Sequence, residues 1–255
     1  MDTILEVRDL CKTYVVNKRQ NNVLKNINLT IHSGEMVAVM GPSGSGKSTL
    51  LYTVSGMDEP SAGQIIFDGR DIAGLDRKTL AQIRLDDMGF IFQQMYMLKN
   101  LSILDNILLP AFQSKKPGMN RKEKIKRGQQ LMRRLGIMET AENDINGVSG
   151  GQLQRACICR SMINNPKMLF ADEPTGALNP ASSDEVIGEL AGLNRDGTTI
   201  LLVTHDVKVA VSCSRVLYLV DGCIAGQYNL EQEKPEADRR ERERAISSWL
   251  LDMGW

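Results

Sequence analysis

The sequence predicts a mixed α/β fold in which helices cover a largely parallel sheet and a helical segment is inserted. Strand-like and helix-like segments alternate along much of the chain, and this alternation is typical of parallel sheets with helices on their faces. From about Ser102 to Asn146 the pattern changes to long helical segments. We find no internal repeat, so we expect one copy of this unit per chain.

The first forty residues are predicted to be strands. Ile27, Leu29 and Ile31 alternate with polar residues, and Met36–Met40 is a continuous apolar run of the buried-strand type. A glycine-rich turn follows, and a helix opened by Leu50 and Leu51 is expected to end near Gly56. Two further strands are predicted at Gln64–Phe67 and Met88–Phe92, set off by Gly63, Gly69 and Gly89.

The inserted segment includes a basic stretch, Gln113–Gln130, which we expect to be a helix with a solvated face. Its only acidic residue is Glu123. The elements expected after the insertion are a strand at Met168–Ala171, a helix at Ala181–Leu193, a strand at Thr199–Val203, a helix from Val207, and paired strands at Val216–Val220 and Cys223–Gln227.

The composition describes a globular protein. The 255 residues include 31 Lys and Arg against 31 Asp and Glu, and this neutral balance disfavours a nucleic-acid partner. The longest apolar runs, such as Val216–Val220, have five residues, far fewer than the roughly 20 that cross a bilayer. The first residues lack the basic and apolar stretches of a signal peptide, so we expect the protein to stay in the cytosol.

The cysteines and His32 carry no chemical signal. There are five cysteines, an odd number without paired C-x-x-C spacing, so we expect no disulfide and no metal–thiolate site. Cys157 and Cys159 are expected to be small buried hydrophobes. His32 lies in a polar turn, and we expect it to be solvated.

A glycine-rich segment between a buried strand and a helix matches G-x-x-x-x-G-K-[ST] in full. Its backbone N–H groups would form an anion nest at the start of the helix, where Lys47 reaches the phosphates and Ser48 supplies a hydroxyl to Mg²⁺. The sequence therefore predicts a P-loop NTPase. The residues expected to bind its nucleotide are Gly41, Pro42, Ser43, Gly44, Ser45, Gly46, Lys47, Ser48 and Thr49.

A second motif supplies two adjacent acids at the end of an apolar strand. Met168–Ala171 is followed by Asp172 and Glu173, as expected of a Walker B strand. We expect Asp172 to hold Mg²⁺ through water and Glu173 to act as the general base on the attacking water.

Between the Walker motifs, Ser149, Gly150, Gly151 and Gln152 form an S-G-G-Q sequence that resembles the signature of ATP-binding-cassette (ABC) ATPases. Taken alone, Ser-Gly-Gly is more often a turn and helix cap. Here it stands among further motifs of that family in the expected order, and the resemblance covers about residues 3–228. As a second anion site, it would hold the γ-phosphate bound by another copy of the chain.

The resemblance assigns roles to three further residues. Tyr14 corresponds to the aromatic residue that stacks on adenine, and Gln93 to the glutamine that contacts Mg²⁺ and the hydrolytic water. His205 corresponds to the histidine that contacts the γ-phosphate. One position departs from the family pattern: Asn179 stands where an Asp is usual, which removes a charge and keeps an acceptor oxygen.

The resemblance also implies architecture and partners. It implies a RecA-like core with a mostly parallel sheet, an antiparallel β subdomain and a helical subdomain at about residues 100–160, all within an ATPase domain at residues 1–230. It implies a head-to-tail dimer that holds ATP and Mg²⁺ between its chains, together with an integral membrane permease. The expected location is therefore the cytoplasmic face of the cell membrane.

Three motifs, at residues 41–49, 89–94 and 171–178, resemble one branch of the family. This branch contains macrolide exporters, lipoprotein-release systems and antimicrobial-peptide resistance transporters. The residues at 248–255 also resemble the Gram-positive peptide-resistance members. We therefore favour a peptide antibiotic or a lipid-linked target as substrate. The alternative is a soluble ABC ATPase that acts as an assembly scaffold, as in iron–sulfur cluster assembly. A DNA-repair ATPase would need long coiled coils between the Walker motifs, and the 125 residues from Lys47 to Asp172 leave no room for them.

The last segment, residues 231–255, is expected to be a helical extension. Glu236–Arg244 is almost wholly charged, and apolar residues then recur at helical spacing. We expect this far end to pack on its own domain or on the dimer mate, since Trp249 and Trp255 favour burial. For the basic stretch Gln113–Gln130, contact with anionic lipid headgroups remains the alternative to a solvated face.

Overall fold

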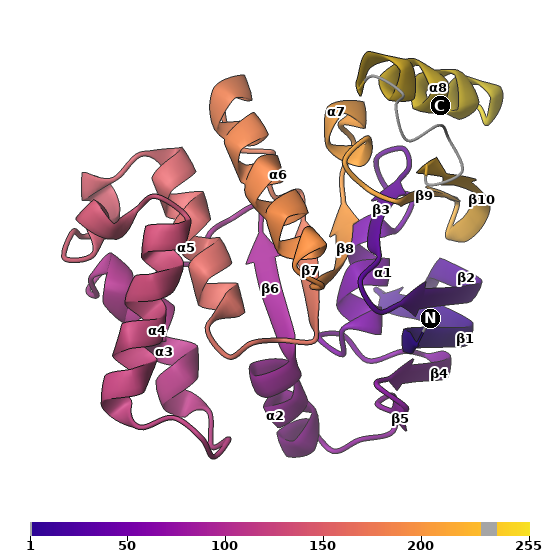
Figure 1. The fold of residues 1–255 in the computed structure, drawn as a ribbon. Helices are drawn as coiled ribbons and strands as arrows, with labels where there is room; N and C mark the ends of the chain where they lie inside the picture. The colour runs from indigo at the N-terminus through magenta and orange to yellow at the C-terminus, as the bar shows by residue number, and fades with distance from the viewer. Residues whose placement is uncertain (1, 231–238) are drawn as a thin grey trace.

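The computed structural model describes residues 2–230 and 239–255. Within these residues the strands form two sheets (Figure 1). The smaller sheet is antiparallel, with the strand order β2-β1-β4-β5. Its strands are β1 (Thr3–Val16), β2 (Arg19–His32), β4 (Ala62–Phe67) and β5 (Arg70–Asp71).

The larger sheet has the order β10-β9-β3-β8-β7-β6, and the strands from β9 to β6 run parallel. The mostly parallel sheet expected from the sequence is confirmed. Every residue of β3, β7 and β8 is buried, as expected of strands covered on both faces. The strands are β3 (Met36–Met40), β6 (Met88–Phe92), β7 (Met168–Asp172), β8 (Thr199–Val203), β9 (Arg215–Val220) and the antiparallel edge strand β10 (Cys223–Asn229).

The two faces of this sheet pack into two separate hydrophobic cores. In β3, successive side chains point alternately into one core and the other. Met36, Ala38 and Met40 pack with the helices on one side, whereas Val37 and Val39 pack toward the antiparallel sheet. The alternation is that of a strand, whose successive side chains point to opposite faces. Because the parallel strands end at one edge, the loops after β3, β7 and β8 are brought together there.

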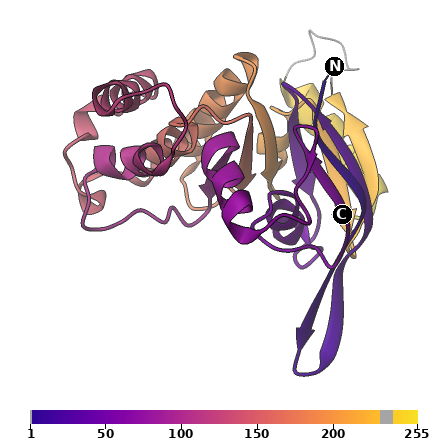
Figure 2. The same cartoon turned by 90° about the horizontal axis from the view of Figure 1, so that it is seen from below.

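The helices divide into two groups (Figure 1). Helices α3, α4 and α5 stand together on the side away from the antiparallel sheet, as the view from below also shows (Figure 2). Their bounds are Ile103–Gln113, Arg121–Arg134 and Gly150–Met162, with short 3₁₀ turns at Met138–Thr140 and Ile145–Gly147 between α4 and α5. The helices nearer the sheets are α1 (Lys47–Val54), α2 (Arg77–Asp87), α6 (Pro180–Arg195) and α7 (Val207–Ala210).

The prediction of a helix over Gln113–Gln130 was wrong. α3 ends at Gln113, and α4 begins only at Arg121. Between them lies Pro117-Gly118, and Asn120 then caps α4 in a reciprocal capping box with Glu123. The uniform basic composition concealed these breaking and capping signals.

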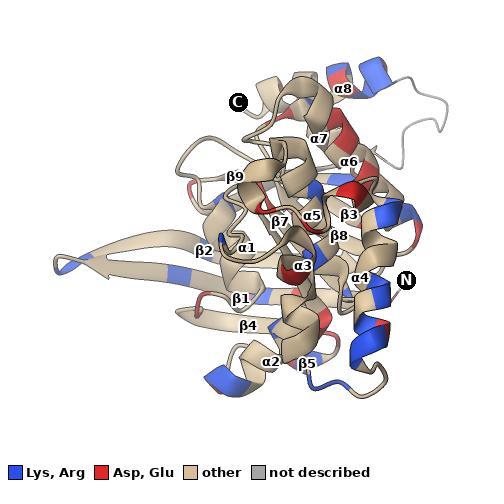
Figure 3. Ribbon diagram, turned by 90° about the vertical axis from the view of Figure 1, so that its left-hand side faces the viewer, with Lys and Arg blue, Asp and Glu red and all other residues tan. Residues whose placement is uncertain are grey.

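The basic residues of α4 do not all face solvent, although Lys and Arg dominate the helix (Figure 3). Lys124 Nζ donates to the Ala111 carbonyl at 2.6 Å, and the Arg127 guanidinium donates to the carbonyls of Met162 and Ile163. The expectation of a solvated face therefore fails for Lys124 and Arg127, which bind carbonyl groups. Lys122 and Lys126 are exposed.

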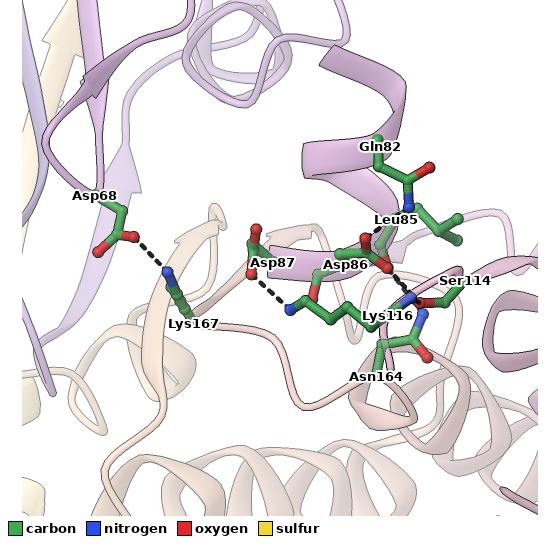
Figure 4. Close-up of polar contacts among 9 residues, drawn as sticks. All are labelled: Asp68, Gln82, Leu85, Asp86, Asp87, Ser114, Lys116, Asn164 and Lys167. Carbon is green, nitrogen blue, oxygen red and sulfur yellow. Dashed lines mark hydrogen bonds and ion pairs between the residues drawn. The ribbon is translucent and has the colours of Figure 1, made fainter. Parts of the chain in front are cut away.

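A polar junction centred on the buried Asp86 joins three segments (Figure 4). The Asp86 carboxylate accepts from Gln82 at 2.6 Å and from Ser114, after α3, at 2.5 Å. Lys116 Nζ donates to the Asp86 carbonyl and pairs with Asp87, while Asn164 donates to the Leu85 carbonyl. The junction therefore ties the end of α2 to the segments that follow α3 and α5.

The C-terminal helix α8 (Arg239–Asp252) lies next to α7 and β10 (Figure 1). Its far end docks on its own domain, as expected: Ile246 and Leu250 are buried, and Trp249 packs closely over Gly226 of β10. The expected burial of Trp255 was wrong, since 42% of this terminal residue is exposed. Residues 236–238 of the charged stretch lie outside the described part of the chain.

Among the residues that the structure describes, no helix is both long and apolar enough to cross a bilayer. The solvated position expected for His32 was also wrong. His32 ends β2 and is half-buried, and within the part of the chain that the structure describes its buried Nδ1 atom has no hydrogen-bond partner. The Glu35 carboxylate accepts from the backbone N–H of His32 and pairs with Arg215, so the turn is folded against β9.

Candidate functional site

The glycine-rich loop follows β3 and leads directly into α1. Gly44 and Gly46 have φ values of +81° and +102°, which only glycine adopts without strain. A Cβ atom on Gly41 would lie 2.1 Å from the Leu219 carbonyl oxygen of β9, so this position has no room for a side chain. Within the described residues no side chain caps the start of α1, whose N–H groups are therefore available to an anion.

The glycine-rich loop carries the polar side chains of Lys47 and Ser45. Lys47 Nζ donates to the carbonyls of Gly41 at 2.8 Å and Pro42 at 2.9 Å, so its ammonium lies over the loop. Burial lowers the pKa of Lys47, while Glu173 and Asp172 act to raise it. The Ser45 hydroxyl oxygen is buried and has no hydrogen-bond partner among the described residues, and a phosphate oxygen would satisfy it.

The carboxylate of Asp172 is buried at the end of β7 and faces α1. The Ser48 hydroxyl donates to its Oδ1 atom at 2.9 Å, and the Tyr52 hydroxyl donates to its Oδ2 atom at 2.5 Å. Burial and the bond to Asp172 raise the pKa of Tyr52. Hydroxyl and carboxylate oxygens are the ligands that Mg²⁺ prefers, so the donors present fit this ion.

Our sequence reasoning missed Tyr52. The signal that could have found it is its spacing: Ser48 and Tyr52 are four residues apart on α1, and residues so spaced share one face of a helix.

Glu173, the next residue, is held in a left-handed conformation with φ at +46°. This conformation is costly for a residue with a side chain and recurs at functional sites. The Glu173 N–H donates to the Val203 carbonyl, and its carboxylate oxygen lies 2.9 Å from His205 Nδ1. The structure therefore brings the expected base and the expected histidine into contact at the ends of β7 and β8.

Gln93 lies beside the loop that follows Glu173. It comes directly after β6 and is exposed, and a Cβ atom on Gly176 would lie 2.9 Å from its side-chain nitrogen. Tyr14 lies on β1 of the antiparallel sheet, and its hydroxyl donates to Asp58, which follows the end of α1. The structure therefore places Gln93 beside the loop after β7 and ties Tyr14 to the residue beyond α1.

The S-G-G-Q segment forms the start of α5. Ser149 is its N-cap: the Ser149 hydroxyl oxygen accepts from the Gln152 N–H at 3.2 Å, and the Gln152 side chain accepts from the Ser149 N–H at 2.9 Å. The hydroxyl proton of Ser149 remains available as a donor. Among the hydrogen bonds of the described residues, none joins this segment to the phosphate-binding loop of the same chain.

Asn179, the departure from the family pattern, is the N-cap of α6. Its side-chain oxygen accepts from the Ser182 N–H at 2.9 Å. Asn and Asp are both strong N-cap residues, so this position keeps its structural role without a charge.

A phosphate-binding loop between a strand and a helix, with an acid-terminated strand facing it, defines a P-loop nucleoside triphosphatase. The family model described as ABC transporter matches residues 24–176. The chain belongs to the ABC transporter family, as the sequence predicted.

The relatives point to one branch of the family. The chain is 40% identical to a protein of Marinobacter nauticus named macrolide export ATP-binding/permease protein MacB, over 96% of this chain and 38% of that protein. It is 39% identical to the uncharacterized ABC transporter ATP-binding protein YknY of Bacillus subtilis, over 87% of this chain and 95% of that one. The chain thus spans 38% of the length of the first MacB relative.

Solved structures share the fold. A dimeric structure of the ATP-binding cassette MJ0796, described as a post-hydrolysis state bound to ADP and Pi, is 37% identical with a TM-score of 0.83, and the match covers 89% of this chain and 99% of that one. CbiO1 of Clostridium perfringens, described as part of an ABC transporter complex, is 29% identical with a TM-score of 0.81, over 100% of this chain and 98% of that one.

Proposed function

We propose that this chain hydrolyses ATP and that the resulting cycle of closing and reopening drives an integral membrane permease. The observation that carries the proposal is the cluster at one edge of the sheet. Glu173 contacts His205, and the neighbouring Asp172 accepts a hydrogen bond from the Ser48 hydroxyl at the end of the phosphate-binding loop.

The residues divide the work as follows. Lys47 and the N–H groups at the start of α1 hold the phosphates, and Ser48 and Asp172, with Gln93, hold the metal. Mg²⁺, when bound, neutralises charge on the phosphate oxygens. Glu173 accepts the proton of the attacking water, and His205, held by Glu173, contacts the γ-phosphate.

We propose that the site is completed by a second copy of the chain in a head-to-tail dimer. Ser149–Gln152 caps α5 with a free hydroxyl proton and makes no hydrogen bond to its own phosphate-binding loop. A γ-phosphate held by one chain could therefore be bound by the α5 terminus of its partner. The dimeric form described for MJ0796 supports this arrangement.

For transport, we propose a permease partner that places the protein at the cytoplasmic face of the cell membrane. MacB is named as an ATP-binding and permease protein, and its match to this chain supports the pairing. We further propose an antibiotic, in particular a peptide antibiotic, or a lipid-linked molecule as the transported substrate. The export named for MacB supports the antibiotic class.

Purification of the native protein from its own membranes tests this function. We expect an integral membrane protein to co-purify. Removal of this membrane protein should abolish ATP-driven transport in reconstituted vesicles. A stable complex with soluble proteins alone would contradict the transporter and favour an assembly scaffold. The Glu173→Gln variant provides the control for hydrolysis.

A further inference from the structure

Lys12, on β1, is buried to a degree that lysine rarely reaches. Only 7% of it is exposed, and lysines at such positions are almost always paired. Its ammonium donates to Asp58 Oδ1 at 2.7 Å and to the Glu59 carbonyl at 2.6 Å. The same ammonium lies 4.6 Å from the centroid of the Tyr14 ring, within the range of a cation–π contact.

The Tyr14 ring is held at a second point by its hydroxyl. This hydroxyl donates to the other oxygen of Asp58, so one carboxylate binds both Lys12 and Tyr14. Burial by itself would raise the pKa of Asp58, but the hydrogen bonds from Lys12 and Tyr14 outweigh it and leave that pKa below its ordinary value. The carboxylate therefore stays ionised at neutral pH.

Asp58 is in turn fixed to the phosphate-binding helix. It follows the end of α1, and the N–H groups of Met57 and Asp58 both donate to the Tyr52 carbonyl, at 2.8 and 3.0 Å. The ring is thus connected to the helix that would hold the phosphates.

We propose that Lys12 and Asp58 are positioning residues that hold Tyr14 as a preset platform for adenine. The inference rests on the proposed ATP site. The Lys12 ammonium covers one face of the ring, so the base stacks on the opposite face. Because the ring is already fixed, binding of ATP does not have to immobilise it.

The test compares two ligands with their Mg²⁺, ATP and inorganic tripolyphosphate, which has phosphates and no base. Equilibrium binding is measured for the wild type, Lys12→Met, Tyr14→Ala and the double variant. We expect Lys12→Met to weaken ATP binding about fivefold, as for the loss of a cation–π contact at a partly exposed ring, and to leave tripolyphosphate binding unchanged. In the Tyr14→Ala background the effect of Lys12→Met on ATP should disappear.

The matched control is Arg8→Met. Arg8 is a cation on the same strand whose ion pair with Glu6 is exposed, and its loss should change neither affinity. The inference is overturned if Lys12→Met weakens both ligands equally, or if it weakens ATP as much without the Tyr14 ring as with it. Either result would mean that Lys12 only stabilises the fold.

The Tyr14→Phe variant tests the same inference if Lys12→Met does not fold. It keeps the ring and removes the bond to Asp58, and we expect ATP binding about threefold weaker with tripolyphosphate unaffected. ATP binding equal to that of the wild type would overturn the inference. Failure of the proposed function is distinct: the wild type would then bind neither ligand, or would bind both unchanged after Lys47→Ala.

Discussion

Tyr52→Phe tests whether α1 positions the carboxylate of Asp172. The substitution removes the hydroxyl that donates to Asp172 Oδ2 at 2.5 Å and keeps the ring. A hydrogen bond to a charged group contributes about 1.5–3 kcal/mol, and Asp172 is only 8% exposed, so water replaces the lost donor poorly. We expect the free energy of unfolding to fall by about 2 kcal/mol and the melting temperature by roughly 4–8 °C.

Two assays check this prediction. Thermal unfolding without nucleotide reports the stability, and a Mg²⁺ titration of the ATPase rate reports the positioning of Asp172. Loss of a residue that orients a metal-binding carboxylate should raise the half-saturating Mg²⁺ concentration roughly tenfold. Tyr96→Phe is the control, because Tyr96 is 64% exposed. Unchanged stability and unchanged Mg²⁺ demand in Tyr52→Phe would refute the reasoning.

Four further predictions follow from the site and the surface. Glu173→Gln should lower hydrolysis at least about 100-fold and trap an ATP-bound dimer in gel filtration, and undiminished turnover would remove Glu173 as general base. Asn179→Asp should leave nucleotide affinity unchanged, because Asp also caps α6, and loss of binding would show that this loop is misassigned. Charge reversal at the exposed Lys122 and Lys126 should weaken sedimentation with anionic vesicles if α4 meets lipid headgroups, and equal sedimentation would remove that contact. In the native protein a thiol reagent should reach the exposed Cys223. The buried cysteines, which are Cys157, Cys159 and Cys213, should react only after unfolding, since burial also raises the pKa of Cys157 to about 11. Rapid labelling of all thiols in the native protein would contradict the fold.

The parts of the site that the residues predicted without the family resemblance are those whose members are neighbours in the chain. Lys47 and Ser48 belong to a loop whose shape depends on its own glycines, and Asp172 and Glu173 end a strand that is recognisable from its apolar run. The bond between Tyr52 and Asp172 was not predicted, because it joins residues 120 positions apart. Tyr52 and Asp172 come together only because α1 packs against β7.

The errors have related causes. Basic composition suggested a continuous helix over Gln113–Gln130, but the short-range signals of Pro117-Gly118 and of the Asn120 cap decided its limits. Polar neighbours suggested a solvated His32, whereas this half-buried residue donates its backbone N–H to Glu35, which pairs with the distant Arg215. Composition describes a segment as a whole, and burial depends on what the rest of the chain places against it.

Helix α1 connects all the parts of the proposed nucleotide site. Its uncapped start faces the phosphates, Ser48 and Tyr52 on one of its faces hold Asp172, and Asp58 just beyond its end holds Tyr14. A shift of this short helix would therefore move the supports of the base, the phosphates and the metal together. Substitutions that loosen α1 should impair base binding and metal binding in parallel, whereas Lys12→Met should affect the base alone and Tyr52→Phe the metal alone.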